Sequence, residues 1–196
     1  MSTEPPMADA QHIDKTVLGK AMELLPSRMD SDQARVMLLA ICGQEADFRH
    51  RWQVIDRARP HVMGPARGLW QFERGGGVRG VLNHPASKAL ALDVCQECSA
   101  RPTLDGVFQA LSSDDVLAAC FARLLLWTDP APLPAVGDVS KAFALYLRTW
   151  RPGAYDRGSP KVRADLRKKW DAYYEQAVVA IASPKRDLNY LRGTAI

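Results

Sequence analysis

Apolar residues recur every three or four positions over much of the chain, which is the spacing of one buried helix face. Proline, glycine and capping residues divide these stretches into separate helices. The predicted helices cover residues 13–25, 33–48, 85–98, 103–111, the stretch from a start signal at 112–115 to 127, 138–150 and 160–183. No segment alternates convincingly between apolar and polar residues, although 66–80 could hold a small hairpin. The pattern predicts a mainly α fold with one irregular lobe at 49–84.

The same pattern suggests where the domain begins and ends. Residues 1–12 are polar, contain Pro5 and Pro6, and are expected to be a flexible N-terminal segment. The chain of 196 residues is long enough for one hydrophobic core, which we expect to lie within a single domain at 13–183. Residues 184–196 are then a C-terminal tail.

One predicted helix carries a single acid on an apolar face. Leu38 lies three and four positions before Ile41 and Cys42. These lie four and three positions before Glu45, and Phe48 is three positions beyond it, so all five share that face. A carboxyl group among apolar neighbours loses water, which favours its protonated form and raises its pKa. Glu45 is therefore a candidate general acid. In the alternative interpretation it reaches solvent or pairs with an arginine nearby in sequence.

The irregular lobe follows this helix directly and contains the segment Gly68–Phe72. Glycine allows close approach of a ligand to the backbone, and Trp70 and Phe72 offer faces on which sugar rings can stack. Gln71 offers both donor and acceptor atoms. The run Gly75–Gly77 could hinge a loop over a ligand, and it lacks the Gly-Lys-Ser/Thr of a phosphate loop. The alternative is a short buried segment with Trp70 and Phe72 in the core.

Three short motifs resemble the lysozyme-like superfamily, above all lytic transglycosylases and related phage peptidoglycan hydrolases. Those families have Glu-Ser-x-Phe, then Gly-Leu-Met-Gln, then a later helix resembling Ala-Tyr-Asn. This chain has Glu45–Phe48, then Gly68–Gln71, then a helix at Lys141–Trp150. The resemblance covers about residues 30 to 155 and implies a lysozyme-like helical domain.

The resemblance also implies roles for individual residues. It makes Glu45 the catalytic acid, Gln71 a residue of the substrate cleft and Tyr146 a candidate cleft tyrosine. Three positions depart from the family pattern: Ala46, Trp70 and Leu147 stand where serine, methionine and asparagine are usual. An inactive virion or tail structural protein with the same fold, or a binding module, is therefore the alternative function.

Glycoside cleavage normally uses two carboxylates, and the candidates for the second are Asp56 and Glu73. Each could instead pair with the arginine that follows it. A lytic transglycosylase needs only one acid, and this route is slightly favoured. Near the end of the helix at 138–150, Arg148 could bind carboxylates of a peptide-bearing glycan, together with Trp150 and Arg151. In the alternative interpretation, these cations complement the helix dipole.

Charge and composition set the remaining expectations. A formal net charge of +4 suits an anionic partner such as a cell-wall polymer. The basic stretch at 161–169 is interrupted by Asp165 and reads as a solvated helix face, so no specific nucleic acid is expected. No membrane span or secretory signal is evident, so delivery to the wall would need a holin or a virus particle, and virion proteins are possible partners.

Cysteine chemistry adds little to this picture. Cys95 and Cys98 have a spacing seen in zinc and redox sites, but Cys42 and Cys120 stand apart from them and from each other. Structural free thiols are favoured over a zinc site or a disulfide. We expect no metal and no cofactor.

Overall fold

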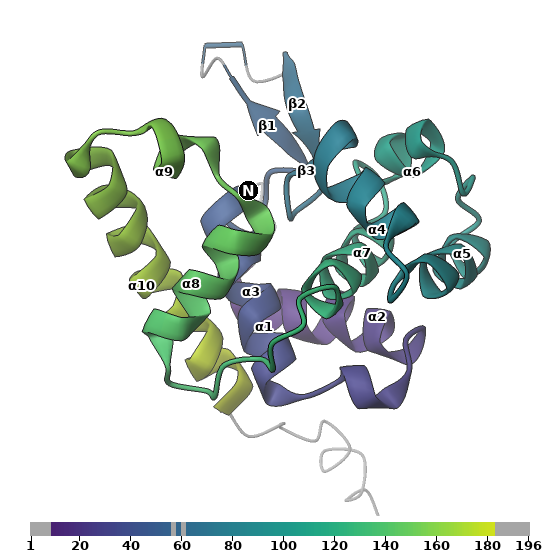
Figure 1. Ribbon diagram of the computed structural model, residues 1–196, viewed down its shortest axis with the longest axis horizontal. Coiled ribbons are helices and arrows are strands. Elements are labelled where there is room, and N and C mark those ends of the chain that lie inside the picture. Colours follow the sequence, from purple (N-terminus) through teal and green to yellow (C-terminus); the bar gives the residue numbers. More distant parts are fainter. Residues whose placement is uncertain (1–8, 56–57, 60–61, 183–196) are drawn as a thin grey trace, which may run out of the picture.

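Figure 1 shows a mainly helical protein with one small sheet at its edge. The computed structural model describes residues 9–55, 58–59 and 62–182. The predicted class, mainly α with a small irregular lobe, is confirmed. The sheet stands between two groups of helices, with α8 to α10 on one side and α4 to α7 on the other.

The helical elements follow one another with short connections. In chain order they are α1 (Ala10–Ile13), η1 (Asp14–Leu18), α2 (Gly19–Glu23), η2 (Ser27–Met29), α3 (Asp32–Ala46), η3 (Arg74–Val78), α4 (Arg79–Asn83), α5 (Lys88–Glu97), α6 (Leu104–Ala110), α7 (Asp115–Trp127), α8 (Val139–Trp150), α9 (Gly153–Arg157) and α10 (Pro160–Ala182). The elements η1 and η3 are π-helical, and η2 is a 3₁₀ turn.

Helix α3 lies at the centre and carries the predicted acid. The Ser31 hydroxyl accepts a hydrogen bond from the Ala34 amide at 3.2 Å, which caps the start of the helix. Unlike a surface helix with a single apolar stripe, α3 is buried on nearly all sides and packs along α10. A Cβ at Gly43 would lie 2.4 Å from the Tyr173 ring, so only glycine permits this close approach.

Several predicted boundaries move in the structure. Helix α3 ends at Ala46 rather than Phe48, because the backbone of the next two residues is left-handed. Helical structure at the N-terminus begins at Ala10, which is buried, so part of the expected flexible segment belongs to the fold. Helix α8 does end at Trp150, as predicted, and Pro152 then precedes a further short helix, α9. Residues 184–196 lie outside the described part of the chain.

The sheet has three short antiparallel strands, β1 (Trp52–Val54), β2 (Met63–Arg67) and β3 (Phe72–Glu73), in that order. The hairpin considered at 66–80 is therefore displaced toward the N-terminus, and its second strand ends at Glu73. The run Gly75–Gly77 belongs to η3, so it is part of a helical turn rather than a loop hinge.

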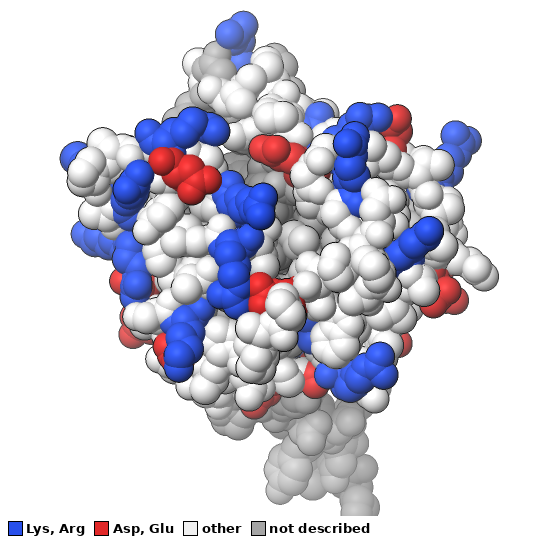
Figure 2. Space-filling view, in the orientation of Figure 1, with Lys and Arg blue, Asp and Glu red and all other residues white. Residues whose placement is uncertain are grey.

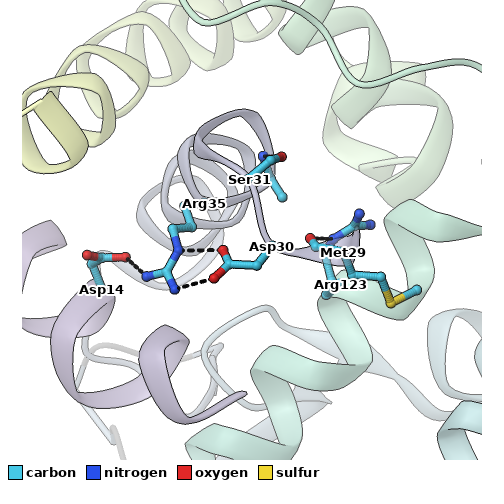
Figure 3. A network of polar contacts seen from close by, with 7 residues as sticks. Asp14, Met29, Asp30, Ser31, Arg35 and Arg123 are labelled. Carbon is cyan, nitrogen blue, oxygen red and sulfur yellow. Dashed lines mark hydrogen bonds and ion pairs between the residues drawn. The ribbon is translucent and has the colours of Figure 1, made fainter. Parts of the chain in front are cut away.

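An ion-pair network fixes the start of α3 against the N-terminal helices (Figure 3). The Arg35 guanidinium donates to Asp30 at 2.6 and 2.8 Å and to Asp14 at 2.7 Å. Beside it, Arg123 donates from Nε to the Met29 carbonyl at 2.8 Å. Bidentate pairs of this kind hold their partners in a defined geometry. The network therefore contributes to placing α3, and with it the acid at its other end.

The described residues were expected to contain free cysteines, no membrane span and no metal site. No helix within the described residues is long and apolar enough to cross a bilayer. All four cysteines are free, and three of them are buried. In the part of the chain that the structure describes, no group of three His, Cys, Asp or Glu side chains could hold a metal ion.

Candidate active site

A cleft of about 750 Å³ opens at the C-terminal end of α3. The sheet and the turn after it form one wall, which includes Gln53, Gln71, Phe72 and Glu73. The end of α8 and the start of α9 form the other wall, which includes Tyr146, Arg148, Trp150 and Arg151. Figure 2 shows this face of the molecule hollowed between the sheet and α8. Glu45, at the end of α3, also lines the cleft.

The Glu45 carboxyl is half-buried and joined to one neighbour by a short hydrogen bond. The Tyr146 hydroxyl donates to Oε1 of Glu45 at 2.6 Å. Burial raises the pKa of Glu45 to about 7, although this hydrogen bond and the charge of Lys169 both oppose the rise. The carboxyl therefore exchanges a proton near neutral pH, as a general acid must.

The aromatic surroundings of Tyr146 fix its position. Its side chain is 1 % exposed and stacks on Trp170, with 4.9 Å between ring centroids and 20° between ring planes. Burial and the nearby Glu45 carboxylate both raise the pKa of the Tyr146 phenol. The phenol therefore remains protonated and serves Glu45 as a hydrogen-bond donor.

Helix α10 holds the end of α3 through polar contacts. Lys169 donates from Nζ to the Gln44 carbonyl at 2.7 Å and lies 3.1 Å from Oδ1 of Asp47. The Tyr173 hydroxyl donates to the same oxygen of Asp47 at 2.7 Å. Although burial opposes it, these hydrogen bonds lower the pKa of Asp47. Asp47 is thus ionised and paired, whereas Glu45, two positions before it in the chain, titrates near neutral pH.

The predicted Gly68–Phe72 segment lies mostly in the core, behind the wall of the cleft that Gln71 and Phe72 line. Gly68 has φ +74°, and a Cβ there would lie 2.8 Å from the Leu111 carbonyl oxygen, so this glycine serves the fold. Trp70 is 0 % exposed and donates from Nε1 to the Leu38 carbonyl at 2.9 Å. Its ring is enclosed by the core, as in the alternative considered from the sequence, and is therefore not available for stacking on a sugar.

Phe72 and Gln71 do line the cleft, with most of their surface engaged by the protein. Phe72 is 2 % exposed and packs near Phe121 and Trp150, so it offers an edge of the wall rather than an open ring face. Gln71 donates from Nε2 to the carbonyls of His50 and Gly68, at 3.1 and 2.9 Å. Its amide oxygen is then the atom left to accept a hydrogen bond.

The two candidates for a second acid differ in their placement. Glu73 lines the cleft, is exposed, and its charge contributes to the raised pKa of Glu45. It does not pair with Arg74 as considered above, because that arginine binds Asp105. Asp56 lies outside the described residues.

Arg148 lies in the cleft, but another carboxylate engages its charge. It donates to Asp129 at 2.6 and 3.0 Å, from Nε and one terminal nitrogen. No local pattern pointed to Asp129, which lies in the proline-rich connection before α8. Lys169 was also missed as a site residue, because in sequence it belongs to a solvated basic helix. Such contacts join residues that are distant in the chain, and no local pattern reveals them.

Left-handed backbone conformations collect around the cleft. Asp47, Phe48, Gln71 and Arg151 have φ between 47° and 60°, although none of them is glycine. Such conformations are uncommon for side chains of this size and persist only where the surrounding structure holds them. They tend to cluster at functional sites. Here Gln71 and Arg151 lie on opposite walls of the cleft, and Asp47 and Phe48 follow Glu45 in the chain, whereas a fifth such residue, Ser99, lies outside the cleft.

A larger groove, of about 1280 Å³, lies at the opposite end of α3. Its principal charged groups satisfy one another, since Arg35 binds both Asp14 and Asp30 there (Figure 3). The cleft, by contrast, holds the Glu45 carboxyl, whose pKa burial raises to about 7. We therefore place the candidate active site in the cleft.

Comparisons with family models, curated proteins and solved structures found no match to this chain. The assignment of the candidate active site therefore depends on the geometry of the cleft.

Proposed function

We propose that the protein cleaves the glycan strands of peptidoglycan, as a lytic transglycosylase or a muramidase, with Glu45 as general acid and base. The observation that carries the proposal is the Glu45 carboxyl, which accepts a hydrogen bond from Tyr146 at 2.6 Å in an open cleft lined by polar and apolar side chains. Burial there raises its pKa to about 7. The motif resemblance supplies the substrate class. The proposal includes a lysozyme-like fold and association with a phage.

The first step uses the protonated form of Glu45. Because its pKa is raised to about 7, Glu45 can carry this proton near neutral pH, and the proton passes to the oxygen that links two sugars. The bond between the anomeric carbon and that oxygen breaks, and the leaving sugar departs with a hydroxyl group. Because the Tyr146 hydroxyl already donates a hydrogen bond to Oε1 of Glu45, we expect Oε2 to carry the proton.

The second step regenerates the acid. The Glu45 carboxylate takes a proton from a hydroxyl of the same sugar, whose oxygen bonds to the anomeric carbon and closes an anhydro ring. Glu45 ends as it began and no water is consumed. In the hydrolytic alternative, water provides the oxygen and a second carboxylate assists, for which Glu73 is the candidate that the structure describes in the cleft. We favour the single-acid route.

Purified peptidoglycan tests the proposal directly. We expect the wild-type protein to release soluble muropeptides and Glu45→Gln to release none while keeping its helical content. Mass spectrometry of the products distinguishes the two chemistries, since anhydro ends mark a transglycosylase and reducing ends a hydrolase. On the single-acid route, Glu73→Gln retains activity and serves as the matched carboxylate control.

A different outcome would favour the alternative function. If the wild-type protein releases nothing from walls of several chemotypes, an inactive virion or tail structural protein becomes the better interpretation. Detection of the chain in purified phage particles tests the proposed association separately from its activity.

A further inference from the structure

The two arginines on the α8 side of the cleft differ in how their charges are used. Arg148 forms an ion pair with Asp129, whose side chain is 9 % exposed, so the two charges neutralise each other. Arg151 lines the same cleft and is exposed. Among the residues that the structure describes, no side chain or carbonyl pairs with the Arg151 guanidinium. It is therefore the cation on this wall whose charge is available to a ligand.

The backbone conformation of Arg151 also supports a functional role for this residue. This residue ends α8 with φ 47°, and its amide donates to the Leu147 carbonyl at 3.1 Å. Glycine or asparagine normally takes this left-handed capping position, because a larger side chain strains it. Pro152 follows at once and restricts the backbone further. Ending the helix does not need an arginine here, and strained residues of this kind occur most often at functional sites.

Basic side chains predominate on the α8 side of the cleft. Figure 2 shows Lys and Arg side chains gathered over α8, α9 and α10, along the border of the hollow. The opposite wall carries Glu73, and Glu45 lies at the end of α3. An anionic group on a ligand is repelled by the Glu73 carboxylate and attracted to the α8 side. The polarity would therefore orient an elongated ligand in one sense.

We propose that Arg151 forms a subsite for a carboxylate of the glycan, so that the cleft prefers carboxylate-bearing strands to neutral ones. This inference rests on the proposed function and assigns a specificity residue to it. The carboxylate could belong to the lactyl ether of the sugar or to a peptide attached to it. Both would form the same charge-assisted hydrogen bonds with a guanidinium.

Three substrates separate these sources: peptide-bearing strands, strands from which an amidase has removed the peptides, and neutral chitooligosaccharides. We expect the wild-type ratio of kcat/KM for anionic over neutral substrates to fall about tenfold in Arg151→Gln, the size of one charged hydrogen bond. Arg151→Lys should recover part of the ratio. A loss only on peptide-bearing strands would assign the carboxylate to the peptide, and a loss on stripped strands to the lactyl group.

Two further variants keep folding defects apart from specificity. Arg151→Gly suits the left-handed backbone, so it should keep or raise the melting temperature while still lowering the ratio. Arg101→Gln removes an exposed charge outside the cleft and should leave the ratio as it is. If Arg151→Gly and Arg151→Gln both keep the wild-type ratio, the inference is overturned.

Binding measurements keep this inference distinct from the proposed function. In the Glu45→Gln background, affinity for the stripped and peptide-bearing strands reports on Arg151 without cleavage. If the wild-type protein cleaves no glycan but Arg151→Gln weakens binding of anionic strands, the proposed function fails and the carboxylate subsite stands. If binding of anionic strands does not depend on Arg151, the subsite fails whether or not cleavage occurs.

Discussion

The phenol of Tyr146 donates a 2.6 Å hydrogen bond to Glu45 across 101 positions of sequence. The two residues come from α8 and α3, and their contact decides the chemistry of the cleft. Burial drives the Glu45 carboxyl toward its protonated form, while the phenol stabilises the ionised form. The balance leaves a pKa of about 7, at which one group can both give and take a proton.

Removing this hydrogen bond should move the pH dependence of cleavage. In Tyr146→Phe, burial acts on Glu45 without the opposing hydrogen bond, so the pKa of Glu45 rises further. General-acid activity is lost as Glu45 ionises, so the alkaline limb of kcat/KM, near pH 7 in the wild type, should move to higher pH. We expect the lost hydrogen bond to cost about 1 to 2 kcal/mol in unfolding free energy.

Tyr174→Phe is the matched control for that experiment. Its hydroxyl accepts a hydrogen bond from the Gly137 amide at 3.0 Å and lies away from Glu45. This variant also loses one buried phenol oxygen, but its pH profile should match the wild type. Equal profiles for Tyr146→Phe and the wild type would contradict the role assigned to Tyr146.

Glu45 should make the protein less stable as the pH rises. Its pKa is about 7 in the folded protein and 4.5 as a reference value, so the folded state binds more protons between these limits. Stability associated with protonated Glu45 is therefore present below pH 4.5 and lost as pH rises through 7. At about 1.4 kcal/mol per pH unit, the loss is on the order of a few kcal/mol.

Glu45→Gln has no carboxyl group at this position, so it should lack this pH-dependent loss of stability. Its unfolding free energy relative to the wild type should therefore increase between pH 4.5 and pH 7 and then level off. Urea unfolding at several pH values measures the difference. Parallel stability curves for the two proteins would mean that the Glu45 pKa is not raised in the folded state.

Lys169 should influence the same titration from α10. Its charge lowers the pKa of Glu45, so Lys169→Met should move the alkaline limb of cleavage to higher pH. The variant also removes a partner of Asp47, whose lowered pKa contributes stability that is present at neutral pH and lost in acid. Both groups are more than a third exposed, so we expect a loss of about 1 kcal/mol or less at pH 7.

The neighbouring Lys168 provides the comparison. It is exposed, and Lys168→Met changes the net charge by the same amount without touching α3. A shared shift in the two variants would show that net charge, rather than the Lys169 contact, governs the Glu45 titration.

The close packing of α3 on α10 can be tested with one methyl group. In Gly43→Ala the new Cβ would lie 2.4 Å from the Tyr173 ring, so the helices must separate. Overpacking of this kind costs about 1 to 3 kcal/mol, and it should also disturb the Tyr173 bond to Asp47. Gly80→Ala, in α4, meets nothing within 4 Å and should be neutral or stabilising by thermal unfolding.

Local chemistry explains why most helices could be predicted from the sequence. The start of α7 is capped by Asp114, whose carboxylate accepts from the Leu117 amide at 2.8 Å, and Asp138 caps α8 in the same way. Such contacts join residues a few positions apart, and the apolar spacing of each helix is also local. The strand β1 was missed and the hairpin of β2 was misplaced, because these strands are short and the buried positions of β2 are the small residues Gly64 and Ala66.

The sequence by itself determined the mainly helical class, the irregular lobe and Glu45 as the residue to test. The tertiary structure alone decided that Tyr146 reaches Glu45, that Trp70 belongs to the core, and that Asp129 neutralises Arg148 while Arg151 is left available. Apolar spacing shows that a face is buried, but it does not show against what. The partners of a charge depend on which distant surfaces meet, and burial and pairing together set its pKa.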